Sequence, residues 1–134
     1  MKRTIRIVSA VIMVIFICCY AIALCEGAEG KHERLDRYSQ TRRIYAGLSI
    51  NEGVACCTGR VTPNSTQSCS LTVRLYKKNG STWDVVRTWT ASATGGQSAY
   101  LCRYVSVGYG TYKVVSTGNV AGEITTSTSS IVTY

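Results

Sequence analysis

Residues Cys69-Ser-Leu-Thr-Val-Arg-Leu75 alternate strictly between side chains that favour the interior and side chains that favour water. This two-residue period is typical of a half-buried β-strand, because successive side chains point to opposite faces of a sheet. The next segment, Lys77-Lys-Asn-Gly80, ends in the Asn-Gly pair that tight hairpin turns favour. Residues 83–90 then supply a partner strand. The stretch predicts an antiparallel hairpin in which the odd-numbered residues of 69–75 face the core.

The same character extends from residue 44 to the C-terminus. Ser, Thr, β-branched and aromatic residues dominate, and no apolar pattern at helical spacing persists for three turns. Further strands are predicted at 44–50, 54–61, 100–107, 111–117 and 123–132. Turns are predicted at 51–53, 63–64, 94–96, 108–110 and 117–119. About seven short strands without helices predict an all-β, antiparallel β-sandwich, with a partly closed barrel as the alternative.

A short motif favours the sandwich over the barrel. The pattern Val107-x-x-Gly110-x-Tyr112-x-Val114 resembles the tyrosine corner of immunoglobulin-like domains. In that motif a Tyr just inside a strand hydrogen-bonds back to the preceding loop and fixes the crossover between the sheets. We therefore expect an immunoglobulin-like sandwich.

The N-terminal segment differs from the rest of the chain. Three basic residues precede the apolar run 7–24, and small residues stand at positions 23 and 25. This arrangement predicts a signal peptide over 1–25 and a secreted, extracellular protein that stays in solution or on the cell surface. The run is about 18 residues long, so an uncleaved membrane anchor is an alternative. Acylation of Cys25, as in a lipoprotein, is another.

Removal of residues 1–25 leaves 109 residues, which is room for one small domain. Residues 26–43 contain few aliphatic side chains and many charges, so they are predicted to form a flexible leader. Residues 44–134 are the predicted sandwich. After removal of 1–25, 12 Lys and Arg face 7 Asp and Glu, a balance that favours anionic partners.

Four cysteines lie in the predicted sandwich: Cys56, Cys57, Cys69 and Cys102. An even number in an exported domain predicts two structural disulfides. Adjacent Cys56 and Cys57 point to opposite faces of a strand and should take different partners. Of the three connectivities, we favour Cys57–Cys69 locally and Cys56–Cys102 across the core. No Cys-x-x-Cys occurs, and the single His, at position 32, lies far from all four, so no metal site or cofactor is predicted.

The predicted sandwich contains few residues that could catalyse hydrolysis. Residues 44–134 contain no His, and their acids are Glu52, Asp84 and Glu123. A hydrolase needs a base beside its nucleophile or a pair of converging carboxylates. Asp84 and Glu123 are expected at solvated loop ends. The sequence therefore predicts a protein that is not an enzyme.

Aromatic residues indicate binding. After removal of 1–25 the chain has eight Tyr and two Trp but no Phe, which gives flat apolar faces with polar tips. Trp83 and Trp89 share strand parity. Either both belong to the core, or they form an exposed shelf that stacks on sugars or on a protein. Tyr104 and Tyr109, near the predicted loop at Gly108, are expected to be exposed.

The expected function is therefore binding of an extracellular or cell-envelope partner. The partner classes are an anionic cell-wall polymer, a carbohydrate or another protein. No specific nucleic-acid binding is expected, because the basic residues are dispersed. Membrane contact is expected only through the N-terminal segment, if it is uncleaved. A small cationic, bacteriocin-like antagonist is the alternative, and a secreted hydrolase is the third.

The chain from about Leu71 onward resembles a family of small secreted proteins of Gram-positive gut bacteria, classed as a domain of unknown function. The shared pattern is a leader peptide, the strand end Leu75-Tyr-Lys-Lys-Asn-Gly-Ser-Thr-Trp83, a second Trp89, and Gly110-Thr-Tyr-Lys. A Ser/Thr-rich end at 125–130 completes it. The resemblance implies export and a β-sandwich, and it implies no catalytic residue.

Overall fold

The structure, a computed structural model, describes residues 32–33 and 39–134. The predicted signal peptide and most of the predicted leader lie outside these residues. Every regular element in the described part is a β-strand. The strands are β1 (His32–Glu33), β2 (Thr41–Asn51), β3 (Val54–Pro63), β4 (Cys69–Asn79), β5 (Thr82–Ala93), β6 (Ala99–Ser106), β7 (Thr111–Val120), β8 (Glu123–Thr128) and β9 (Val132–Thr133). Across these same residues, no helix has the length and hydropathy that a bilayer crossing requires.

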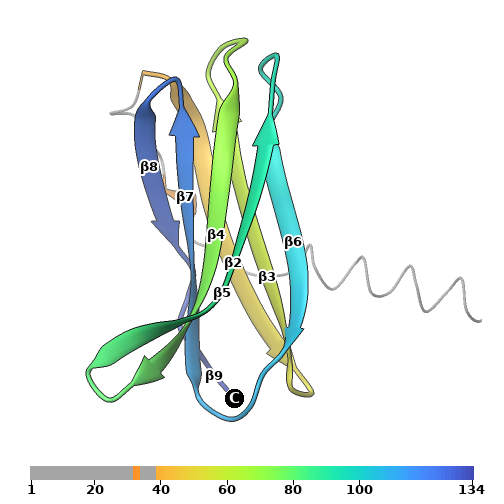
Figure 1. Cartoon of the computed structure of the whole chain (residues 1–134), viewed down its shortest axis with the longest axis vertical. Coiled ribbons are helices and arrows are strands. Elements are labelled where there is room, and N and C mark those ends of the chain that lie inside the picture. The colour runs from red at the N-terminus through yellow and green to blue at the C-terminus, as the bar shows by residue number, and fades with distance from the viewer. Residues whose placement is uncertain (1–31, 34–38) are drawn as a thin grey trace, which may run out of the picture.

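Two antiparallel sheets pack face to face as a sandwich (Figure 1). Sheet A has the order β1-β2-β3-β6, and sheet B has the order β5-β4-β7-β8, with β9 paired to β7. Apart from β1 and β9, these orders correspond to the A-B-E and C′-C-F-G sheets of immunoglobulin-like domains. The predicted fold, an immunoglobulin-like antiparallel β-sandwich, is confirmed, and β2–β8 are its seven longer strands.

The tyrosine corner is present where the sequence predicts it. Tyr112 lies near the start of β7, just after the chain crosses from sheet A to sheet B. Its ring is buried, and its hydroxyl donates a hydrogen bond to the carbonyl oxygen of Gly108 at 2.8 Å. This bond holds the β6–β7 loop against the first residues of β7.

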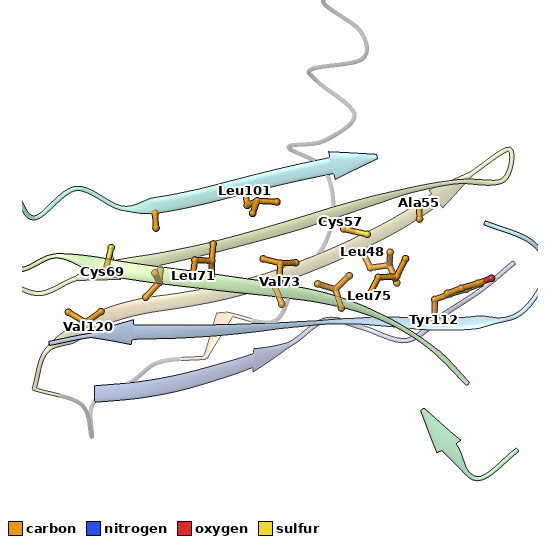
Figure 2. Packing of buried hydrophobic residues seen from close by; sticks show 14 residues of the cluster. Leu48, Ala55, Cys57, Cys69, Leu71, Val73, Leu75, Leu101, Tyr112 and Val120 are labelled. Atoms are coloured by element: carbon orange, nitrogen blue, oxygen red, sulfur yellow. The ribbon is translucent and has the colours of Figure 1, made fainter. Parts of the chain in front are cut away.

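The core lies between the two sheets, with β4 at its centre. The four odd-numbered residues of 69–75 are all buried, as predicted. Figure 2 shows Leu71, Val73 and Leu75 facing Cys57 and other residues of sheet A. Full burial of each aliphatic side chain contributes about 1.5–3 kcal/mol.

A glycine lets the two sheets approach closely at the middle of the core. A Cβ at Gly59 of β3 would lie 2.4 Å from Val73 Cγ2 and 2.7 Å from Ser116 Oγ. Contacts that short force neighbouring side chains or backbone to move. The short distance between the two sheets at this point therefore depends on a glycine at position 59.

One predicted turn is wrong. Residues 117–119 do not turn, because β7 continues to Val120 and the chain reverses at Ala121–Gly122, with φ of 50° and 88°. Gly118 serves packing instead: a Cβ there would lie 2.6 Å from Val61 Cγ2 of sheet A. A glycine that allows close approach has the same sequence signal as a glycine in a turn.

The sandwich also begins earlier than the predicted boundary at residue 44. β2 starts at Thr41, and the carboxylate of Glu123, at the start of β8, accepts backbone hydrogen bonds from three successive residues. The donors are the N–H groups of Thr41 at 2.8 Å, Ser39 at 3.1 Å and Gln40 at 3.3 Å. Burial opposes ionisation of Glu123, but the hydrogen bonds outweigh it, so the pKa of Glu123 is lowered. Glu123 is thus a structural anchor, where a solvated loop end was expected.

Candidate binding surface

A β-bulge in β5 separates the two tryptophans. Along the β4–β5 ladder, Leu75 pairs with Arg87 and Tyr76 pairs with Val85, so Val86 is an extra residue. An extra residue shifts the side-chain alternation by one position. Trp83 and Trp89, which share parity in the sequence, consequently lie on opposite faces of sheet B.

Trp89 belongs to the interior side. It pairs with Val73, which is fully buried, and it packs half-buried against the core cluster. Trp83 pairs with Lys78 near the hairpin end, on the outer face of sheet B. The two residues therefore form neither a joint core element nor a common shelf.

Trp83 is part of a cluster in which a lysine contacts two aromatic rings. The ammonium of Lys113, on β7, lies 4.2 Å from the ring centroid of Trp83 and 5.7 Å from that of Tyr76. Tyr76 and Lys113 are directly paired across the β4–β7 ladder, so both point outward from sheet B. A cation over an aromatic face is stabilised by about 0.5–1 kcal/mol at an exposed site.

Two further cations share this outer face. Arg74 and Lys78 have the same parity on β4 as Tyr76, and the intervening Leu75 points into the core. We call the five outward cationic and aromatic residues on this part of sheet B the cationic-aromatic face. Its members are Arg74, Tyr76, Lys78, Trp83 and Lys113.

The acids of the sandwich lie elsewhere. Asp84 pairs with Lys77, so it lies on the opposite face of the hairpin, where its carboxylate accepts a hydrogen bond from Asn79 Nδ2 at 2.9 Å. Glu52 occupies the β2–β3 turn, and Glu123 anchors the start of β2. Within residues 39–134 the cationic-aromatic face therefore carries positive charge with no acid of its own.

The β4–β5 hairpin end projects from the body of the sandwich, at the lower left in Figure 1. Val85, which pairs with Tyr76, is 54% exposed there. Lys77, on the other face of the hairpin, turns back toward the sandwich and lies 5.6 Å from the ring centroid of Tyr112. The projection is thus braced on one face and presents cations and rings on the other.

Tyr104, the third predicted binding residue, is exposed as predicted. It lies on β6 at the edge of sheet A and is 55% exposed, beside Tyr100 on the same face. The guanidinium of Arg60 lies 5.0 Å from the Tyr100 ring centroid. Burial and the neighbouring Cys56 raise the pKa of Tyr104.

Tyr109, the fourth, is 81% exposed in the β6–β7 loop, also as predicted. Its ring stacks on Tyr134 with centroids 4.9 Å apart and an interplanar angle of 12°. Gly110 and Tyr134 exchange two backbone hydrogen bonds of 2.9 Å beneath this pair. Three of the four predicted binding residues therefore lie on three separate surfaces, and the fourth, Trp89, packs against the core.

Neither favoured pairing, Cys57–Cys69 or Cys56–Cys102, is formed, although Cys102 is disulfide-bonded. Cys56, Cys57 and Cys69 are in the thiol form. Cys57 and Cys69 both face the core, but Figure 2 shows them at different places along the sandwich. Cys56 and Cys102 lie on the outer face of sheet A, not across the core. Their Sγ atoms are 3.8 Å apart, whereas a disulfide bond is about 2.05 Å long.

The buried thiol of Cys57 has low reactivity. Burial, with a smaller contribution from Cys56, raises the pKa of Cys57 to about 12. Because the thiolate is the reactive form, such a thiol is a poor nucleophile and metal ligand at neutral pH. Within residues 39–134, no group of three His, Cys, Asp or Glu side chains is placed to hold a metal ion.

Sequence reasoning identified Trp83 but missed its neighbours. Lys113 and Arg74 were counted only as dispersed basic residues, because they lie almost 40 positions apart in the chain. The signal that links them is the β4–β7 pairing, which no local pattern specifies. Alternation on β4 alone could have placed Arg74 and Lys78 on one face with Tyr76.

No protein-family model matches the chain, and no curated protein matches it. Among solved structures, the GAE domain of GGA2p from Saccharomyces cerevisiae is similar at 13% sequence identity. The alignment covers 79% of this chain and 96% of that chain, with a TM-score of 0.30. A likeness of this size says nothing about function, which has to be inferred from the surface itself.

Proposed function

We propose that this protein is an exported binding module that holds a polyanionic polymer of the cell envelope on its cationic-aromatic face. The observation that carries the proposal is the position of Lys113, whose ammonium lies within cation–π distance of both Trp83 and Tyr76 on an outward face. Export rests on the apolar N-terminal run and its cationic start.

The electrostatics of the face support an anionic partner. Three cations stand on adjacent strands with no acid among them, so their potentials add. The rings of Trp83 and Tyr76 reduce the number of conformations that Lys113 can adopt. A cation held in place loses less side-chain entropy on binding than a free one.

The rigid framework supports the same conclusion. Arg74 and Tyr76 flank Leu75 on β4, and Leu75 is buried in the core against sheet A, whereas Lys78 lies near the projecting end of the hairpin. A site on strands is held more precisely than a site on loops. The partner can therefore meet a flat, preformed array without ordering a segment of the protein.

The test is binding of the full chain to envelope fractions, with and without their anionic polymers, over a range of salt concentrations. We expect retention on the intact fraction, loss on the stripped fraction, and steady weakening as salt screens the charges. Lys113→Gln should weaken binding about 5- to 10-fold. The matched charge change Arg103→Gln, on sheet A, should alter it by less than about 2-fold.

Circular dichroism of both variants checks that the sandwich is intact. Equal retention on the stripped fraction would contradict the proposal. An equal loss for Lys113→Gln and Arg103→Gln would show that net charge, and not this face, governs binding.

A further inference from the structure

We infer that Cys102 forms its disulfide bond with Cys25, and that residues 26–31 cross the outer face of sheet A between this bond and β1. The inference concerns the sheet opposite the cationic-aromatic face and does not depend on the proposed function. It follows from the state of the cysteines, the burial on sheet A and the register of its strands.

The state of the cysteines leaves few partners for Cys102. Cys102 is disulfide-bonded, whereas Cys56, Cys57 and Cys69 are thiols. The chain has seven cysteines, and the other three, at positions 18, 19 and 25, precede β1. A partner within the chain must therefore come from the N-terminal segment. A disulfide here agrees with export, because such bonds persist in oxidising compartments.

The outer face of sheet A is covered at its centre. Cys56 and Thr58 of β3 alternate with the core residue Cys57, so they face outward, yet they are only 5% and 4% exposed. Thr72, an outward residue in the middle of β4 in sheet B, is only half-buried. The solvated face of an antiparallel sheet normally meets water. Further chain lying over the centre of sheet A accounts for the difference between the two threonines.

The strand register places Cys102 within reach of Cys25. His32 pairs with Tyr45, and the same row of paired residues continues through β3 to Tyr100 on β6. Cys102 lies two residues farther along β6, so at about 4.8 Å per strand and 3.4 Å per residue it is roughly 16 Å from His32. Cys25 precedes His32 by seven residues, which span roughly 23 Å when extended. The remaining reach accommodates the roughly 6 Å between the Cα atoms of bonded cysteines.

The intervening residues suit a close passage over this face. Residues 26–31 are Glu-Gly-Ala-Glu-Gly-Lys, in which glycine and alanine let the backbone approach a surface closely. The two glutamates complement a face whose strands β2, β3 and β6 contain no acid, and on which Arg60 lies over the ring of Tyr100.

Position in the leader selects Cys25 over the other two cysteines. Cys18 and Cys19 lie inside the apolar run 7–24, the part of a signal peptide that export removes. Cys25 stands just after that run. If it is bonded to Cys102, any cleavage of the leader falls before Cys25, and not after it as the sequence alone suggested.

The first test is disulfide mapping of the full chain, exported by its own leader and alkylated before any reduction. We expect Cys102 to stay unmodified until it is reduced, and its peptide to be linked to the peptide that carries Cys25. Alkylation of Cys102 without reduction, or its linkage to any other cysteine, overturns the inference. A mature chain that begins at Glu26 also overturns it.

The second test measures stability. Cys25→Ser and Cys102→Ser should each lower the thermal midpoint by about 10 °C, because the bond closes a long loop of chain. The double variant should be no less stable than either, since both changes remove the same bond. Cys19→Ser is the matched control and should leave the midpoint unchanged. Additive losses in the double variant would show that the two cysteines act separately and overturn the bond.

The third test uses the folded double variant to examine the crossing segment. Without the bond, the Cys56 thiol should be alkylated about 10-fold faster than in the wild-type protein. The Cys57 thiol, in the core of the same molecule, is the internal control and should stay unreactive in both proteins. An unchanged rate at Cys56 would assign its burial to the neighbouring side chains and overturn the crossing segment.

Discussion

The two halves of the β4–β5 hairpin belong to one hydrogen-bonded ladder but have different roles: one half is packed in the core, and the other forms an exposed surface. In the body, β4 buries Leu71, Val73 and Leu75, and Trp89 of β5 packs against the same core. At the tip the same ladder continues beyond the body of the sandwich (Figure 1), Val85 is exposed, and Lys113 contacts the ring of Trp83. The extra residue Val86 marks the division. The comparison shows that one hairpin can stabilise the fold with one half and offer a surface with the other.

The largest effect should come from truncation in the body. Leu75→Ala removes a fully buried side chain at the centre of the core and should lower the free energy of unfolding by about 2–5 kcal/mol. Val85→Ala, across the bulge, should change it by no more than about 0.5 kcal/mol. Urea denaturation of both variants makes the comparison. Similar losses for the two would show that the tip is part of the folding core.

Substitution of the two tryptophans should show the same division: one variant should lose mainly stability, and the other should lose mainly polymer binding. Trp89→Ala should cost about 2–3 kcal/mol of unfolding free energy, because its half-buried indole packs against the core. The Trp83 ring is also half-buried but lies outside the core cluster, so Trp83→Ala should cost about 1 kcal/mol, mainly the lost contact with Lys113. Polymer binding should be weakened by Trp83→Ala and kept by Trp89→Ala. The reverse pattern would contradict the placement of Trp89 against the core and of Trp83 on the binding face.

A smaller effect isolates the hydrogen bond of the tyrosine corner. Tyr112→Phe keeps the buried ring, and with it the contact to Lys77 of the tip, but leaves the Gly108 carbonyl without this donor. The unfolding free energy should fall by about 1 kcal/mol. Tyr109→Phe, at an exposed ring, is the control and should leave the thermal midpoint unchanged. An unchanged unfolding free energy for Tyr112→Phe would mean that packing alone fixes the crossover between the sheets.

The smallest effect is expected in the pH dependence of the body. Because the folded-state pKa of Glu123 is lowered, its contribution to stability is present above the ordinary Glu pKa of about 4.5. It is lost as the pH falls through the lowered folded-state value. Glu123→Gln should flatten the acid side of the stability profile without changing the polymer affinity of the tip at neutral pH. An unchanged acid slope, measured by urea midpoints from neutral to acid pH, would contradict the anchor role.

Local patterns predicted much of the fold because they act over a few residues. Alternation fixed the inward set of β4, and the Gly-x-Tyr motif identified the tyrosine corner at Tyr112. Predictions that depended on distant pairing did less well. Gly118 was taken for a turn because its packing partner, Val61, lies in the other sheet. Cys56 and Cys102 were placed across the core, whereas β3–β6 pairing puts them on one outer face.

The sequence by itself determined the strand pattern, the buried face of β4 and the excess of positive charge, since each follows from residue type and period. Only the tertiary structure decided which cations meet which rings. The bulge at Val86 reverses the side-chain direction of one strand half, and the β4–β7 ladder brings Lys113 beside Tyr76. Both depend on hydrogen bonds between strands far apart in the chain, which leave no signal in any short window.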